Sequence, residues 1–358
     1  MRPSASTIIA SVAATLLWVG CLAVAAKATQ PGECQVPDNL ASDVAVPQQE
    51  PSAIVREHQA LFTAIDRFVN PGESDPHWSF TADALALQRT DTRKQPLALD
   101  TNGDALLDAG HLDPSAAMGF QLSAIRHGPC GWDLELGYFQ IDGWIANAFV
   151  AGQSFMVTDA AGSGFNVVGP LARYWSGLHM AEINVRHQWL DGLTLLAGFR
   201  TGELDEAYDA SGTDITSLQP DVLNAKTFNH LYGFQVGADW ECYNMGGPLR
   251  ISALCKSGIY DNSASQRCRQ IDTGSLLNQS VEASRNQATF MGEAGAVATY
   301  DVTCHLSLRA FFQTIWIEGV ALAPEQIGAT DFLSNTATID THGGIFYYGG
   351  GLGMELKF

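Results

Sequence analysis

The sequence predicts an all-β protein, a closed antiparallel transmembrane β-barrel of about ten strands preceded by a short N-terminal periplasmic helix. Three observations support this fold class. Residues after position 77 repeatedly alternate apolar and polar side chains with a period of two, as amphipathic strands do. The connections between these segments alternate between short and long. The composition of 46% hydrophobic and only 16% charged residues, with 35 Gly, disfavours a disordered chain.

Charge and hydropathy exclude two other classes. The chain has 38 Asp and Glu against 19 Lys and Arg, a formal net charge of −19, which would repel nucleic acid. After the N-terminus, no run approaches the roughly 18 apolar residues that a spanning helix needs. We therefore expect neither a nucleic-acid partner nor helical membrane spans.

The chain before the barrel divides into two parts. Residues 1–28 carry Arg2, an apolar run over 8–24 and small residues up to Ala28, the pattern of a signal peptide. Residues 29–77 form a periplasmic tether that contains an amphipathic helix from Ser52 to the Asn-Pro-Gly stop at 70–72. This helix could pack against the periplasmic end of the barrel, plug its lumen or mediate oligomerisation.

The barrel is expected over residues 78–358. Each segment is long enough to cross a bilayer as a tilted strand of about 9–11 residues. In 193–200, for example, Leu195 and Phe199 share one face and Arg200 lies on the other. The predicted strands cover 78–89, 116–127, 132–145, 171–189, 193–204, 229–241, 249–260, 288–301, 305–318 and 345–358.

Connection length assigns the two ends of the barrel. Short turns are predicted at 127–131, 190–192, 242–248 and 301–304, and long polar loops at 90–115, 146–170, 205–228, 261–287 and 319–344. In transmembrane barrels the short turns face the periplasm and the long loops face outside. With ten strands, the first residue of the first strand and the last residue of the last strand both lie on the periplasmic side.

The two faces of the strands differ in chemistry. One face is apolar, with aromatic residues near the strand ends, and suits lipid. The other carries charges that hydrocarbon cannot hold and so must line the lumen. These side chains form either a stabilising internal network or the selectivity lining of a pore. The predicted lumen-lining residues are Glu135, Glu182, Arg186, Arg200, Asp239, Arg250, Lys256, Glu293 and Arg309.

The last strand provides the most specific local motif. Met354, Leu356 and the terminal Phe358 alternate with polar residues. This ending resembles the C-terminal signature of bacterial outer-membrane proteins, and residues 78–358 as a whole resemble the β-barrel porin families. The resemblance implies an outer-membrane location, contact with outer-membrane lipid and recognition by the barrel-assembly machinery. It supplies no catalytic residues and no cofactor.

Two smaller sites are candidates only. Asp100, Asn102, Asp104 and Asp108 have the alternate spacing of calcium ligands in an EF-hand loop. Ala105 and His111 replace the Gly and Glu expected there, so an acidic surface turn is the simpler interpretation. Cys242 and Cys304 lie at neighbouring predicted turns and could form a disulfide, with free thiols as the alternative.

Function follows from barrel size and charge. The five predicted loops contain 17 Asp and Glu against 6 Lys and Arg, which would attract cations. Barrels of eight strands are filled by side chains, and those of 16–18 strands enclose a channel. We therefore predict a porin-like narrow, cation-preferring channel for small solutes. A non-conducting barrel for surface-loop display, adhesion or envelope anchoring is the alternative. An enzyme ranks third, because no catalytic spacing such as GxSxG or HExxH occurs.

Overall fold

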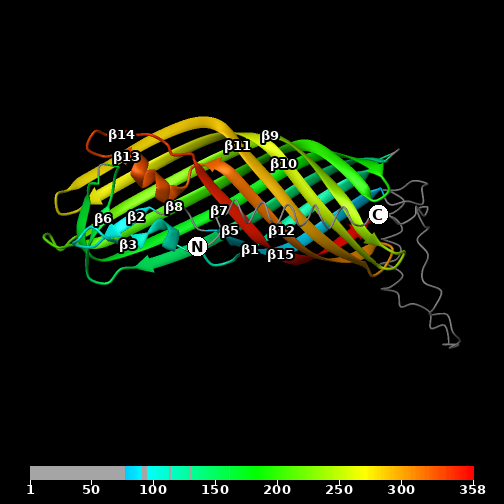
Figure 1. Ribbon diagram of the computed structural model, residues 1–358, viewed down its shortest axis with the longest axis horizontal. Coiled ribbons are helices and arrows are strands. Elements are labelled where there is room, and N and C mark those ends of the chain that lie inside the picture. The colour runs from blue at the N-terminus through cyan, green and yellow to red at the C-terminus, as the bar shows by residue number, and fades with distance from the viewer. Residues whose placement is uncertain (1–76, 91–94, 113, 129–130, 161) are drawn as a thin grey trace, which may run out of the picture.

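The computed structural model describes residues 77–90, 95–112, 114–128, 131–160 and 162–358. The predicted signal peptide, tether and helix lie outside these residues. Ten of the fifteen strands form a barrel-like ring (Figure 1). They are β1 (Trp78–Arg89), β4 (Ala117–His127), β5 (Trp132–Phe149), β7 (Gly164–Leu190), β8 (Leu193–Asp214), β9 (Pro220–Asn244), β10 (Leu249–Asp272), β11 (Leu277–Asp301), β12 (Leu306–Val320) and β15 (Gly343–Lys357).

Each ring strand pairs antiparallel with two neighbours. The pairings run in chain order from β1 through β4, β5 and β7 to β12 and β15, and β15 pairs back with β1. The last pairing begins where Trp78 and Phe358 exchange backbone hydrogen bonds of 3.0 and 2.9 Å. Backbone groups of a strand in lipid need such partners, because no water is available to replace them. All ten predicted segments are therefore strands of this ring.

The strands are longer than predicted at the end away from residues 77 and 358. The regions 205–228 and 261–287, predicted as loops, are mostly continuations of β8 to β11 and turn over at 215–219 and 273–276. The prediction failed because the outward side chains become polar there while the inward face mixes apolar and polar residues, so neither face is consistently apolar. Inward residues such as Tyr208 and Ala210 stay buried. We call the part of β7–β11 over 164–178, 203–230 and 261–288 the extension.

Shorter elements accompany the extension. They lie toward the left end of Figure 1, opposite the C-terminus. They are β2 (Pro96–Leu99), β3 (Ala105–Asp108), the 3-10 helix η2 (Ala109–His111), β6 (Gln153–Val157), the 3-10 helix η4 (Ala323–Ala329), β13 (Thr330–Asp331) and β14 (Thr336–Ala337).

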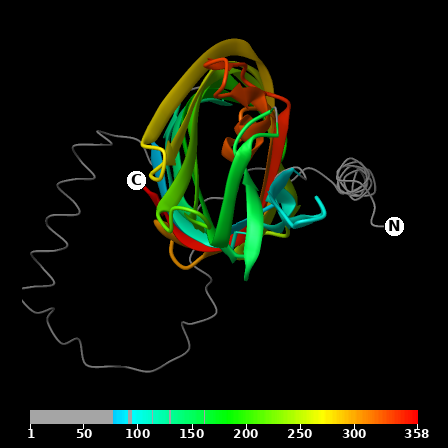
Figure 2. The same cartoon turned by 90° about the vertical axis from the view of Figure 1, so that its left-hand side faces the viewer.

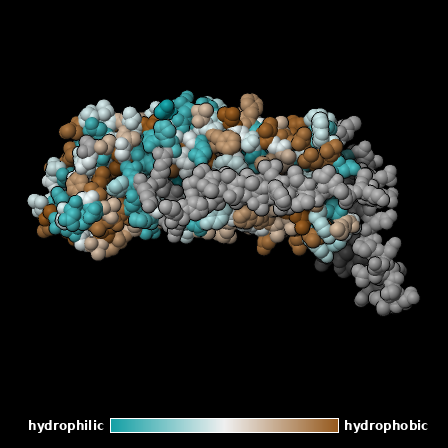
Figure 3. Space-filling view, viewed as in Figure 1, coloured by the Kyte–Doolittle hydropathy of each residue, from teal (hydrophilic) through white to brown (hydrophobic). Residues whose placement is uncertain are grey.

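The outer face of the ring is apolar where a bilayer would surround it. Phe234, Phe312 and Leu352 expose 76%, 53% and 69% of their surface, and they point away from the ring interior. Trp132 and Trp189 lie near the turn end, as expected for an interfacial girdle. Hydrophilic side chains are more frequent toward the extension on the face shown in Figure 3. Among the described residues, no helix is both long and apolar enough to span a membrane.

The predicted disulfide between Cys242 and Cys304 is not formed, and both thiols are free. Cys242 lies near the end of β9, and Cys304 lies in the turn between β11 and β12. Two strand spacings therefore separate them, about 9–10 Å, whereas the Cα atoms of a disulfide lie within about 6.8 Å of each other. The disulfide prediction was wrong because neighbouring hairpins are not neighbouring strands.

The free thiols allow a test of the lipid-facing band. Cys255 is exposed on the outer face of β10, while Cys242 and Cys304 are exposed near the turns. In single-cysteine variants reconstituted in lipid discs, we expect a charged maleimide to label Cys242 and Cys304 but to reach Cys255 only after detergent is added. Cys268 is buried and serves as an unreactive reference. Equal labelling of Cys255 in lipid would contradict the proposed membrane-facing surface.

Candidate functional site

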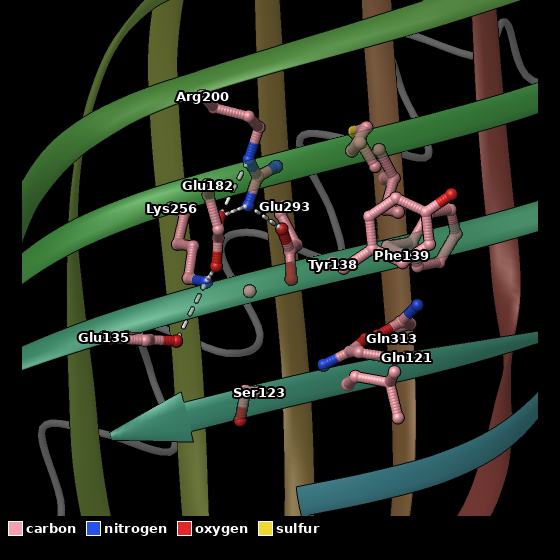
Figure 4. A pocket seen from close by; sticks show the side chains of 14 residues that line it. Gln121, Ser123, Glu135, Tyr138, Phe139, Glu182, Arg200, Lys256, Glu293 and Gln313 are labelled. Atoms are coloured by element: carbon pink, nitrogen blue, oxygen red, sulfur yellow. Dashed lines mark hydrogen bonds and ion pairs between the residues drawn. The ribbon is translucent and has the colours of Figure 1, made fainter. Parts of the chain in front are cut away.

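Charged side chains from six strands converge inside the ring. Arg200 on β8 lies between two carboxylates, with its Nη2 atom 2.5 Å from Glu182 and 2.7 Å from Glu293 (Figure 4). Lys256 Nζ lies 2.5 Å from the other carboxylate oxygen of Glu182. The alternation of each strand directs these side chains inward, since the flanking residues face outward.

A second arm continues this cluster toward the turn end. Arg186 bridges Glu135 at 3.0 Å and Asp239 at 2.8 Å. Lys256 joins the two arms, because its Nζ atom also lies 3.9 Å from Glu135. We call these seven residues the ion-pair network. Each of its charges has a partner of opposite sign, the condition under which buried charge is tolerated.

Two predicted lumen residues lie apart from the network. Arg250 pairs with Asp301 at 3.1 Å, and Arg309 approaches Asp83 at 3.5 Å. The remaining seven predicted residues are brought together, with inward-facing Gln235 as an added hydrogen-bond donor to Glu182 at 2.9 Å. Each of the nine predicted residues thus has an ion-pair partner in the structure. Local sequence patterns could not have identified these partners.

The space left beside the network is small. A cavity of about 40 Å³ lies among Glu135, Glu182, Arg200 and Lys256, with Gln121 and Gln313 on its far wall (Figure 4). A single water needs roughly 10–15 Å³ of such space. The cavity can hold only a few waters.

An apolar layer fills the ring between the ion-pair network and the extension. Trp144 is fully buried, its indole N–H donates to the Leu87 carbonyl at 2.9 Å, and its ring centroid lies 4.8 Å from that of Tyr347. Leucine, isoleucine and methionine side chains from the surrounding strands complete the layer. Its other members include Leu85, Ile141, Leu178, Met180, Leu204, Leu231, Met291, Ile315, Ile317 and Ile345.

The segment 319–342, here called the strap, folds into the ring on the side of this layer that faces the extension. Figure 2, which looks along the ring from the extension, shows η4 within the outline of the strands. Leu322, Ala323 and Ile327 are fully buried. The sequence predicts a long outer loop over 319–344; a long connection does lie at this end, but its first part, up to Ile327, turns into the ring instead of facing outside. The apolar run at 320–323 was the available signal, since a solvent-exposed loop has no use for it.

One buried carboxylate holds the strap. Glu206 on β8 accepts the backbone N–H of Ala323 at 2.9 Å, and its other oxygen lies 2.8 Å from Arg89 Nη1. Both charged side chains are fully buried. Asn229 adds a pair of hydrogen bonds to the backbone of Ala321, of 2.9 and 2.8 Å. Sequence reasoning missed Glu206 because it was placed in a predicted loop.

The calcium candidate forms local turns instead. The Asp100 carboxylate accepts the backbone N–H groups of Asn102 and Asp104, both at 2.8 Å. Asp108 caps η2 through the Gly110 N–H at 2.9 Å. Within the described part of the chain, no three His, Cys, Asp or Glu side chains are placed to hold a metal ion together. This geometry favours the surface-turn interpretation.

The predicted assembly motif lies on the outer face of the final strand. Met354 and Leu356 are exposed to the surroundings of the ring, and the Phe358 ring lies 6.2 Å from that of Phe80. The motif therefore coincides with the pairing of β15 and β1. Its recognition by the assembly machinery stays a prediction.

Comparison with known proteins is informative about architecture only. No protein-family model matches the chain, and no curated protein matches it. The outer membrane protease OmpT from Escherichia coli aligns over 80% of this chain and 99% of its own, with 10% identity and a TM-score of 0.46. The translocator domain of autotransporter NalP from Neisseria meningitidis aligns over 85% and 96%, with 10% identity and a TM-score of 0.38.

A third similar structure, the toluene transporter TbuX from Ralstonia pickettii, aligns over 80% and 90%, with 10% identity and a TM-score of 0.33. In this chain an apolar outer face surrounds a polar, charged interior, which is the arrangement of transmembrane β-barrels. The architecture is that of an outer-membrane β-barrel. The predicted location in the bacterial outer membrane agrees with this architecture.

Proposed function

We propose that the protein is a non-conducting outer-membrane barrel that holds the extension outside the membrane as a surface for attachment. The filled interior of the ring is the observation that carries this proposal. The ion-pair network, the apolar layer and the strap occupy successive levels of the same lumen. A conducting pore would need a continuous wet passage, and packed side chains of this kind exclude water.

The paired charges also argue against a selectivity lining. A pore that selects ions presents charge to the solute, whereas Arg200 and Glu182 expose only 5% and 11% of their side chains. Their charges are paired with side chains of opposite sign inside the ring and are not presented to a solute. The stabilising interpretation of the lumen charges is therefore the better supported one.

The extension is built as a stiff sheet with a hydrophilic outer face. Cross-strand pairs connect its strands, including Arg267 with Glu282 at 2.6 Å and Arg269 with Asn278 at 3.0 Å. Asn224 hydrogen-bonds Asp209 on the neighbouring strand. Continuous strand pairing holds the distal turns at a fixed distance from the membrane, which suits a surface that meets another molecule.

Conductance measurement in planar bilayers tests this proposal. We expect the purified, folded protein to insert without stepwise current at any applied voltage, because no passage crosses the apolar layer. Insertion is verified separately by protection of the barrel from protease. Discrete cation-selective steps whose selectivity changes in Arg200→Ala would contradict the proposal and support the narrow channel instead.

A further inference from the structure

Three turns at the distal end share one local design. Each begins with Asp, has Ser at the fourth position and places the fifth residue in the left-handed backbone region. In each, the first carboxylate accepts the backbone N–H of the serine. The turns are 214–218 (Asp-Ile-Thr-Ser-Leu, 2.5 Å), 272–276 (Asp-Thr-Gly-Ser-Leu, 2.9 Å) and 331–335 (Asp-Phe-Leu-Ser-Asn, 3.0 Å).

The fifth residue is unexpected in two of these turns. Leu218 and Leu276 have φ angles of 56° and 59°, and Asn335 has 52°. Gly and Asn adopt this region readily, but a leucine Cβ is crowded there by the following carbonyl group. Asn335 shows that the same turn in the same chain accepts the favoured residue. The two leucines therefore are not explained by turn geometry.

Exposure makes these leucines more unusual. Leu218 and Leu276 expose 73% and 87% of their surface, and Leu333 in the third turn exposes 90%. Such side chains bury almost no area in the fold. Leu218 and Leu276 combine backbone strain with apolar exposure, and Leu333 adds exposure alone; contact with another molecule would account for both features.

The three turns belong to one surface. Thr273 donates its backbone N–H to Asp221 at 3.3 Å and its hydroxyl to the Pro220 carbonyl at 2.6 Å, which joins the first two turns. Gln279 next to the second turn donates to the Phe332 carbonyl in the third at 3.3 Å. All three lie toward the left end of Figure 1. We call residues 214–219, 272–277 and 331–336 the tip surface.

The tip surface is acidic as well as apolar. It contains Asp214, Asp272 and Asp331 and neither Lys nor Arg. Hydrogen bonds from the serines lower the pKa of all three carboxyls, which keeps them ionised at neutral pH. Burial, followed by the Asp272 and Asp214 charges, raises the pKa of adjacent Asp221, which shows how closely these acids gather.

We propose that the tip surface docks on a protein whose surface presents apolar pockets bordered by Lys or Arg. The leucines fill the pockets, and the flanking carboxylates pair with the basic rim. This inference rests on the proposed function, because it requires the distal end to be displayed outside the membrane. A lipid bilayer is the less suitable target, since insertion of each leucine would draw an ionised carboxylate toward hydrocarbon.

A defined probe tests the docking chemistry. The full-length protein in zwitterionic lipid discs is titrated with a short fluorescent peptide that alternates Leu and Lys, and binding to empty discs is subtracted. We expect binding that weakens at least about tenfold in the triple variant Leu218→Asn, Leu276→Asn and Leu333→Asn. A peptide with Glu in place of Lys should not bind, and added salt should weaken the interaction.

Two controls separate docking from folding. Leu106→Asn removes an exposed leucine of β3 outside the tip surface, and its affinity should stay within about twofold of the parent. Leu218→Asn and Leu276→Asn should leave the melting temperature unchanged or raise it, because Asn suits the left-handed conformation. A lowered melting temperature would show that the leucines serve the fold and would overturn the proposal.

Other outcomes are equally decisive. Unchanged peptide affinity in the triple variant would overturn the proposal, as would leucine-dependent binding to zwitterionic vesicles without peptide, which would indicate a membrane target. Stepwise conductance of the parent protein would instead refute the proposed non-conducting function and leave the peptide result standing.

Discussion

Arg200→Met is expected to lower the free energy of unfolding by about 3–5 kcal/mol, the range for removing one partner from a buried ion pair. The change removes the cation that pairs with Glu293 and leaves Glu182 with Lys256 as an ion-pair partner and Gln235 as a neutral donor. Met fills a similar volume, so loss of packing contributes little. Urea unfolding in lipid vesicles, followed by tryptophan fluorescence and by the gel mobility of the folded form, measures the effect.

An exposed ion pair provides the matched control. Arg267 and Glu282 form a pair at 2.6 Å with side chains 61% and 60% exposed, so Arg267→Met should cost no more than about 0.5 kcal/mol. The double variant Arg200→Met and Glu293→Gln should recover much of the loss, because it removes the uncompensated carboxylate and keeps Glu182 paired with Lys256. If Arg200→Met and Arg267→Met have equal effects, the ion-pair network does not stabilise the barrel.

Arg89→Met is expected to have a similar cost, about 3–5 kcal/mol, and also to loosen the strap. Arg89 is the cation beside Glu206, and without it the carboxylate keeps neutral partners such as the Ala323 N–H and the Ser176 hydroxyl at 3.5 Å. A buried charge with so little compensation favours a conformation that admits water. Limited proteolysis should therefore show faster cleavage within 319–342.

The partner substitution separates charge from hydrogen bonding. Glu206→Gln keeps a carbonyl oxygen for the Ala323 N–H but leaves Arg89 without its counter-charge, so it too should destabilise the fold. The double variant Arg89→Met and Glu206→Gln should be more stable than either single variant, since it removes both buried charges. Equal cleavage of the strap in parent and Arg89→Met would show that Glu206 does not hold it.

The sequence was sufficient to predict the strands within the membrane. Their faces are set locally, because lipid demands apolar residues at every second position and the lumen tolerates charge at the others. Leu195, Phe199 and Arg200 could therefore be assigned from their spacing alone. The predicted bounds of β1 match the structure, and those of β4 and β12 agree within two residues.

Outside the membrane that local rule no longer applies. Water accepts polar side chains on the outer face, so Lys226 and Arg267 sit in regular strands that look like loops in the sequence. The distal turns are likewise unusual, because Leu218 and Leu276 occupy positions where Gly or Asn would have marked a turn. Periodicity was thus informative only where the surroundings impose it.

By itself, the sequence determined that this chain forms an antiparallel barrel with a lipid-facing exterior and a charged interior, because burial between lipid and lumen constrains each strand separately. Only the tertiary structure decided which charges pair, as in Arg200 with Glu293, 93 positions apart, and that the strap enters the ring. Those contacts depend on the number and stagger of the strands around the ring, which fix the distances across the lumen. Two residues that are far apart in the chain can meet across the lumen, and their separation in the sequence does not indicate this contact.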